Sequence, residues 1–513
     1  MKQNNAKGIK IRSLLFLIAA IFTLQACKKS DSEIGQVFFK ETNNKVFKEV
    51  QNEAFISVFK KTLEEKKSSL RNPKFISAYY ESNNFQPVLV TQHLPKEQLK
   101  VMADYLSKSD SHGLDPQIFG SNTLVELLKK VYDKNAIKNV DEAYKAIAEL
   151  EIMVANSLID YSNALQFGMI SPRKIYATYY TETKRPDSAS MANILKVNDL
   201  KTYLDSIQPK GAQYLALQEG LAKGISAPGH TAEETARILK VNLERLRWKN
   251  RKDNQKFVIV NIPDFRLDVI ENGKSILNMK VCVGEGRELN NSDILKEYDE
   301  VDLKKDRPFS RETPQLGSMI HSVQVNPVWN IPESIATKEI IKDAAADRYY
   351  LSNKNIDVFK DGKKIEDPET IDWSDPNAGK IYTFKQRSGN GNSLGKIKFL
   401  FKNESAVYLH DTPAQAAFKQ SMRAVSHGCV RLEKPLELAH VLFGDGKQYE
   451  QIKADMAQTE NQTARDIALP KQIPIYLTYF TAWKAEDGTI QFRKDIYGLD
   501  VVLYSYLQKL VKS

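Results

Sequence analysis

The apolar residues of this 513-residue chain change their spacing once, close to residue 250. Before that point they recur every three or four positions, for example from Leu99 to Leu106 and from Ile147 to Leu165. This spacing places apolar side chains along one face of a helix. We therefore expect residues 72–250 to form a helical scaffold domain that contributes no catalytic residue.

After this region the apolar positions alternate or form short continuous runs, a pattern typical of β-strands. Two such runs, Phe265–Ile270 and the one that begins at Ile276, flank Asn272-Gly273, which is a strong signal for a two-residue hairpin turn. Pro435–Phe443 is the one helical patch that we expect inside this region. The sequence thus predicts a multidomain α+β protein in which a β-rich domain spans residues 256–498.

Three segments fall outside this two-part pattern. Residues 27–71 are polar and rich in lysine, and we expect them to be a tether. Residues 287–311 are strongly charged and are expected to be a surface insertion, and residues 499–513 are expected to be a C-terminal tail.

The first 27 residues resemble the signal sequence of a bacterial lipoprotein. A basic stretch precedes the apolar run Leu14–Leu24, which is too short to span a bilayer comfortably. Leu24-Gln25-Ala26-Cys27 looks like a lipobox, so residues 1–26 are expected to be removed and Cys27 to carry the lipid. An ordinary secretory signal with a chance cysteine is the alternative. Lys28 in place of aspartate favours a periplasmic protein anchored to the outer rather than the inner membrane.

The formal net charge of +10 suits an anionic setting such as cell wall or phospholipid head groups. The charges are dispersed, so nucleic acid is not an expected partner. The three cysteines have separate expected roles: Cys27 is lipidated, Cys282 lies buried and unpaired in a strand, and Cys429 is reactive. The histidines lack metal-ligand spacing, and we expect neither a metal nor a cofactor.

Candidate chemistry is concentrated between His410 and Cys429. An unperturbed thiol has a pKa of about 8.5, so it needs a neighbouring base to act as a nucleophile near neutral pH. A histidine can supply that base. Gly428, directly before the cysteine, allows a tight backbone that can present N–H groups to a substrate carbonyl.

The string Ser426-His427-Gly428-Cys429-Val430-Arg431, preceded by His410, resembles the signature of the L,D-transpeptidases with a YkuD domain. Asn326–Pro332, Leu394–Phe399, Asn84–Leu89 and His112–Pro116 are similar to segments of the large, YcbB-like branch. Residues 333–380 resemble its capping subdomain, whereas we see no room for the peptidoglycan-binding module that this branch often carries.

The resemblance implies a set of roles for residues around the cysteine. Cys429 would be the nucleophile and His410 the proton acceptor and donor, oriented by the backbone carbonyl of Asp411. His427 would support the thiol or only its loop, and the N–H groups of Gly428 and Cys429 would stabilise an oxyanion. Substrate contacts are expected from Arg431, Ser426 and Trp329, although an internal salt bridge, a turn and core packing are their respective structural alternatives.

The activity implied is transfer of a peptidoglycan stem peptide through a cysteine thioester. A tetrapeptide donor would lose its terminal D-alanine and form a 3→3 cross-link, and carbapenems would acylate the same thiol. Two alternatives use the same sequence features: an L,D-carboxypeptidase, in which water replaces the acceptor amine, and a non-catalytic lipoprotein that binds peptidoglycan. Stem peptides and a membrane are the expected partners.

Overall fold

The computed structural model describes residues 32–248, 255–286, 311–459 and 462–512, which separate into two compact units. The first contains residues 32–109, 115–162 and 186–208, and the second contains residues 110–114, 163–185 and those from 209 onward. The predicted signal peptide, Cys27 and nearly all of the predicted charged insertion lie outside the described residues. Within the described ranges, no helix combines the length and apolarity that a membrane span needs.

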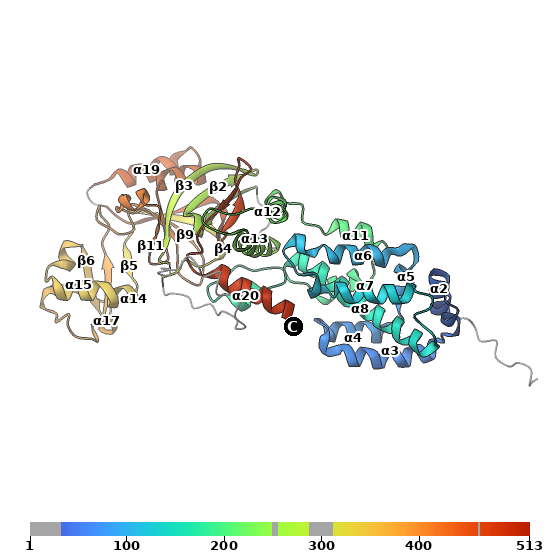
Figure 1. Cartoon of the computed structure of the whole chain (residues 1–513). Helices are drawn as coiled ribbons and strands as arrows, with labels where there is room; N and C mark the ends of the chain where they lie inside the picture. The colour runs from blue at the N-terminus through green and yellow to red at the C-terminus, as the bar shows by residue number, and fades with distance from the viewer. Residues whose placement is uncertain (1–31, 249–254, 287–310, 460–461, 513) are drawn as a thin grey trace, which may run out of the picture. The chain divides into compact units, whose positions relative to one another are not determined.

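The first unit is entirely helical, as the spacing of its apolar residues predicts (Figure 1). Its most regular stripe is confirmed, because Leu99, Met102, Ala103 and Leu106 are all buried. Its longer helices are α2 (Glu33–Thr42), α3 (Asn52–Lys66), α4 (Pro73–Ser82), α5 (Val88–His93), α6 (Gln98–Ser107), α7 (Ser121–Tyr132), α8 (Val140–Phe167), α10 (Ser188–Ile194) and α11 (Leu200–Ser206). Helix α8 belongs to this unit as far as residue 162, and its last turn belongs to the second unit.

The prediction of a tether over residues 27–71 is wrong for the part that the structure describes. Helices α2 and α3 are amphipathic, and their aromatic residues Phe38, Phe55 and Phe59 are fully buried together with Phe47 between them. The many lysines of the segment occupy the solvent face and hide this pattern in the composition. Residues 32–71 are therefore an integral part of the helical unit.

The second unit is built on a nine-stranded sheet in the order β11-β3-β12-β10-β9-β4-β13-β1-β2. Strand β3 pairs with β12 along its second half and with β2 along its first half, so the sheet closes on itself. Closure leaves few unpaired strand edges. The strands are β1 (Lys256–Asn261), β2 (Arg266–Glu271), β3 (Lys274–Gly284), β4 (Leu316–Val325), β9 (Ile397–Phe401), β10 (Leu409–His410), β11 (Ala424–Ser426), β12 (Val430–Leu432) and β13 (Arg465–Thr478).

Two local predictions in this unit are confirmed. Asn272 and Gly273 both have positive φ angles, 51° and 79°, and connect β2 to β3 in a hairpin. The predicted helix is α18, which spans Pro435–Phe443. Other elements are α9 (Pro172–Ile175), α12 (Ala212–Ala222), α13 (Ala232–Arg247), α19 (Lys447–Ala457), α20 (Leu499–Lys512) and the hairpin of β14 (Ala482–Lys484) and β15 (Ile490–Phe492).

The boundaries of the β-rich domain differ from the predicted ones at both ends. Helices α12 and α13, predicted as scaffold, pack into the core of the second unit, where Leu217, Leu239 and Leu243 are almost completely buried. The expected C-terminal tail is helix α20, and Leu503 on it is fully buried in the same core. The sequence break near residue 250 therefore marks a change of secondary structure rather than a change of compact unit.

The capping insertion is larger than the predicted residues 333–380. Its four-stranded antiparallel sheet, β5-β8-β6-β7, begins with β5 (Trp329–Ile331) and ends with β8 (Tyr382–Gln386). Trp329 packs against the separate apolar core of this insertion. This contact favours a role in core packing, the structural alternative, over a contact with substrate. The other elements are β6 (Ile356–Lys360), β7 (Lys363–Ile365), α14 (Glu333–Ile335), the π-helical turn η8 (Ala336–Ile340), α15 (Ile341–Ala346), α16 (Tyr350–Asn353) and α17 (Ala378–Ile381) (Figure 1).

Candidate active site

The candidate site begins with a row of three side chains on adjacent strands of the large sheet. His410 on β10 is paired with Lys398 on β9 and with Arg431 on β12. Side chains alternate across a strand, and the preceding residue Leu409 faces the core with no exposed surface. The row of Lys398, His410 and Arg431 therefore lies on the opposite face of the sheet.

Cys429 enters this face from the turn before β12. The backbone N–H of Val430 donates to the carbonyl of Tyr408 at 3.1 Å, which fixes the cysteine beside Tyr408. The Tyr408 side chain is hydrogen-bonded to the Cys429 thiol, and its ring meets the His410 ring edge-on with centroids 5.8 Å apart. Tyr408 thus contacts both groups that the sequence singles out.

His410 is held by its neighbour in the chain. Its Nδ1 lies 2.5 Å from the backbone carbonyl oxygen of Asp411. Because a carbonyl only accepts, Nδ1 carries the proton and Nε2 is left as the basic nitrogen. Burial lowers the pKa of His410 to about 3, and the charges of Arg431 and Lys398 act in the same direction. The imidazole is therefore neutral near pH 7.

The thiol is neutral in the resting site as well. Burial raises the pKa of Cys429, although hydrogen bonds from Tyr408 and the charges of Arg431 and Lys398 act in the opposite direction. With both groups neutral, the site holds no thiolate–imidazolium pair before substrate arrives. This arrangement suits general-base catalysis, in which the proton leaves the thiol as the thiol attacks.

The position of Asp411 depends on a glycine in the preceding loop. The Asp411 carboxylate accepts hydrogen bonds from the backbone N–H of Lys396 at 2.8 Å and of Thr412 at 2.7 Å. Gly395 lies against this carboxylate in a left-handed conformation with φ of 63°, and a Cβ there would be 2.4 Å from Asp411 Cγ. The loop can therefore approach Asp411 only without a side chain at residue 395.

The turn that carries the thiol is closed by Ser426. Its hydroxyl donates to the carbonyl of Cys429 at 2.5 Å and accepts from the backbone N–H of Gly428 at 3.2 Å. Ser426 is fully buried, so it is a turn residue and does not line a substrate site. The N–H of Gly428, expected to bind an oxyanion, is already donated within the turn, whereas the Cys429 N–H has no hydrogen bond recorded among the described residues.

His427 connects the turn to the capping insertion. Its Nε2 lies 2.7 Å from a carboxylate oxygen of Glu339 in η8, and Arg311 forms an ion pair with the same oxygen. Burial raises the pKa of Glu339, but the hydrogen bonds and charges of His427 and Arg311 outweigh it and lower the pKa overall. These three side chains are partly exposed. Through Glu339 they connect the cysteine turn to the insertion, so His427 supports the turn rather than the thiol.

Sequence reasoning missed Lys398, Tyr408 and Glu339. Tyr408 stands two residues before His410, so strand alternation alone puts both on one face. Lys398 is a charged residue inside the apolar run Ile397–Phe401, which is the signal that a side chain leaves the core. Glu339 gives no comparable signal, because only the folded insertion brings it to His427.

Comparison with known proteins also separates a scaffold region from a catalytic region, but the scaffold match extends into α12, which packs in the second compact unit. Residues 74–221 match a family model described as a scaffold domain, and residues 255–443 match the L,D-transpeptidase catalytic domain. A protein of Haemophilus influenzae, whose name places it among the L,D-transpeptidases, is 28% identical over 352 residues. That match spans 68% of this chain and 66% of the length of the relative.

A solved structure of an L,D-transpeptidase from Mycobacterium smegmatis is 12% identical and covers 44% of this chain and 58% of its own. Its TM-score of 0.20 is too low to define a shared fold. The match to the catalytic-domain model, by contrast, spans residues 255–443 and so includes both His410 and Cys429. The chain thus carries an L,D-transpeptidase catalytic domain that follows a helical scaffold domain.

Proposed function

We propose that this protein forms 3→3 peptidoglycan cross-links through a thioester on Cys429. The thiol attacks the carbonyl of the third residue of a tetrapeptide stem while His410 Nε2 takes its proton. His410 then gives that proton to the leaving amine, and D-alanine departs. An acceptor amine on a second stem attacks the thioester, a new amide forms and the thiol is restored.

One observation carries the proposal. A buried, neutral imidazole, whose Nδ1 is committed to the Asp411 carbonyl, lies on the strand next to the turn that carries the partly buried Cys429, and Tyr408 contacts both. The free N–H of Cys429 is the donor that supports an oxyanion in this scheme. The N–H of Gly428 is engaged with Ser426 and has no part in it.

Mass spectrometry of products from a purified disaccharide-tetrapeptide tests the proposal. Dimers that have lost one D-alanine, together with an acyl adduct on Cys429, are the expected result. The variant Cys429→Ala should yield neither, while Cys282→Ala, which removes the other described cysteine, should yield both. Tripeptides without dimers would show a carboxypeptidase instead, and products at the wild-type level from Cys429→Ala would refute the thioester.

We also propose that Cys27 anchors the protein to a membrane, on the strength of the lipobox-like Leu24-Gln25-Ala26-Cys27. Two or more acyl chains hold a protein far more firmly than one. Metabolic labelling with a fatty-acid analogue should mark the wild type and not Cys27→Ser. Labelling of both would place the lipid elsewhere.

A further inference from the structure

We propose that Lys398 and Arg431 form a subsite for the terminal carboxylate of the donor peptide, so that the site selects stems that end one residue beyond the scissile bond. The inference rests on the proposed function and adds a determinant of substrate choice to it. It starts from the two cations that flank His410 in the sheet.

In the part of the chain that the structure describes, neither cation has an acidic partner of its own. No carboxylate among the described residues lies within the 4.0 Å of an ion pair from Lys398 or Arg431. Asp466, which interacts with Lys398 at longer range, instead accepts a hydrogen bond from Gln324 at 2.9 Å. A partly buried cation without a counter-ion is costly, and a bound anion would remove that cost.

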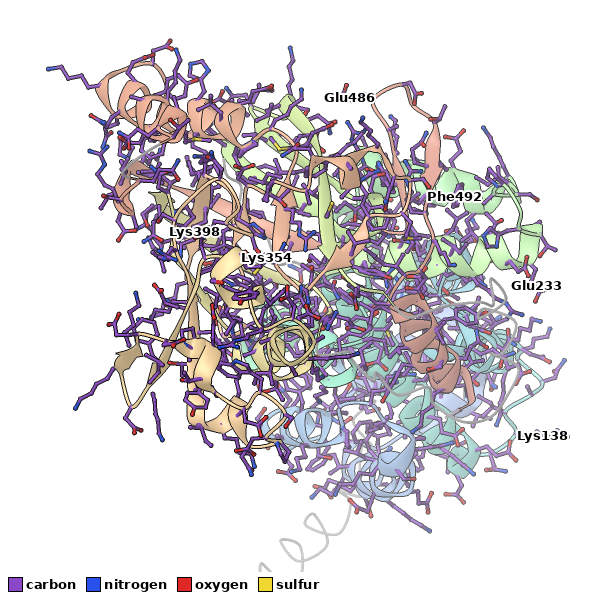
Figure 2. The ribbon with its side chains drawn as sticks, turned by 90° about the vertical axis from the view of Figure 1, so that its left-hand side faces the viewer. Lys138, Glu233, Lys354, Lys398, Glu486 and Phe492 are labelled. Carbon is purple, nitrogen blue, oxygen red and sulfur yellow. The ribbon has the colours of Figure 1, made fainter. Side chains whose placement is uncertain are left out.

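Lys398 is also held in place on the site face. Its ammonium lies 5.4 Å from the centre of the Tyr408 ring, which keeps it beside the tyrosine that contacts Cys429. Figure 2 labels Lys398 among the side chains of the second unit. Electrostatic effects of Lys398 reach both Cys429 and His410, so the cation acts where the reaction occurs.

The geometry of the leaving group brings a carboxylate to this place. His410 must touch the leaving nitrogen to protonate it, and in a tetrapeptide that nitrogen belongs to the last residue. Its carboxylate carbon is two bonds away, roughly 2.5 Å from the nitrogen. Cross-strand neighbours have Cβ atoms about 5 Å apart, so the long side chains of Lys398 and Arg431 can both reach that carboxylate.

A donor with one more residue would not satisfy the subsite. Its carboxylate would lie farther from the leaving nitrogen by one residue, up to about 3.8 Å. An amide group would occupy the position between the two cations, where it cannot neutralise them. Charge-assisted hydrogen bonds of this kind correspond to roughly ten- to hundredfold in kcat/KM.

The test compares two synthetic donors, a tetrapeptide with a free C-terminal carboxylate and the same tetrapeptide as its C-terminal amide. We expect the wild type to prefer the free acid at least tenfold in kcat/KM. Lys398→Met should bring the ratio of kcat/KM for the two donors close to one, and Lys398→Arg should restore most of the preference for the free acid. Lys402→Met is the matched control, because it removes an exposed lysine just after the same strand and should keep the wild-type ratio.

The ratio separates recognition from damage to the fold, since a misfolded variant loses both donors equally. Equal use of both donors by the wild type would overturn the subsite while leaving the proposed function intact. A full preference for the acid in both Lys398→Met and Arg431→Met would overturn it as well. If the wild type used neither donor, the proposed function itself would fail.

Discussion

Replacing Gly395 by alanine tests how His410, the proposed base, is positioned. The added Cβ would lie 2.4 Å from Asp411 Cγ and from one of its carboxylate oxygens, in a backbone with φ of 63°. The left-handed conformation costs a residue with a side chain roughly 1 to 2 kcal/mol. Relieving the contact displaces the carboxylate from the two backbone N–H groups that it binds, at about 1 kcal/mol each. The total loss of stability is roughly 3 to 4 kcal/mol.

Function should suffer in addition to stability, because the carbonyl that orients His410 belongs to Asp411. Thermal unfolding measures the first effect, and the rate of Cys429 acylation by a carbapenem, followed by intact mass, measures the second. Gly391→Ala is the matched control in the same loop, since a Cβ there meets nothing within 4 Å. If Gly395→Ala matched this control in both measurements, the glycine would have no role in placing Asp411, and our account of the histidine would be wrong.

Three further predictions concern the same site. The pKa of His410 is lower in the folded protein than in the unfolded chain, so the unfolded chain binds a proton at higher pH. The free energy of unfolding should therefore decrease as the pH falls from about 6.5 to 3. His410→Asn should lose that dependence in calorimetric titrations. Tyr408→Phe removes a hydrogen bond to the thiol and should slow acylation of Cys429 roughly tenfold with little change in melting temperature; an unchanged rate would contradict the contact. Glu339→Gln should change the free energy of unfolding by less than about 1 kcal/mol, because its ion pairs are partly exposed, and a larger loss in denaturant titrations would show that they lock the insertion to the core.

Much of the fold is encoded locally and was predictable for that reason. The β2–β3 hairpin follows from Asn272-Gly273, and α18 follows from its own apolar spacing after Pro435. The two failures at the ends of the chain had signals of the same kind. Phe55, Phe59 and Leu63 stand four residues apart in α3, and an equivalent stripe is buried in α20, but charged neighbours obscured both.

The candidate site was predictable only as far as one segment of chain defines it. His410 and Cys429 lie close in sequence, and parallel pairing of their strands brings them together. The engagement of the Gly428 N–H by Ser426 depends on the exact turn, and the contact of Glu339 with His427 depends on a separate small core 88 residues away. Such partners require tertiary structure, which the pattern of one sequence does not provide.

The closure of the large sheet determines when the folded surroundings of the Cys429 thiol can form. Strand β1 lies between β2 and β13, and β13 ends at residue 478. The same core includes Leu503 and Leu507 of helix α20. Almost the whole chain must therefore be available before the strands beside His410 and Cys429 can be held in register. Until α20 packs, this core is incomplete, so we expect the surroundings of Cys429 to become ordered late in folding.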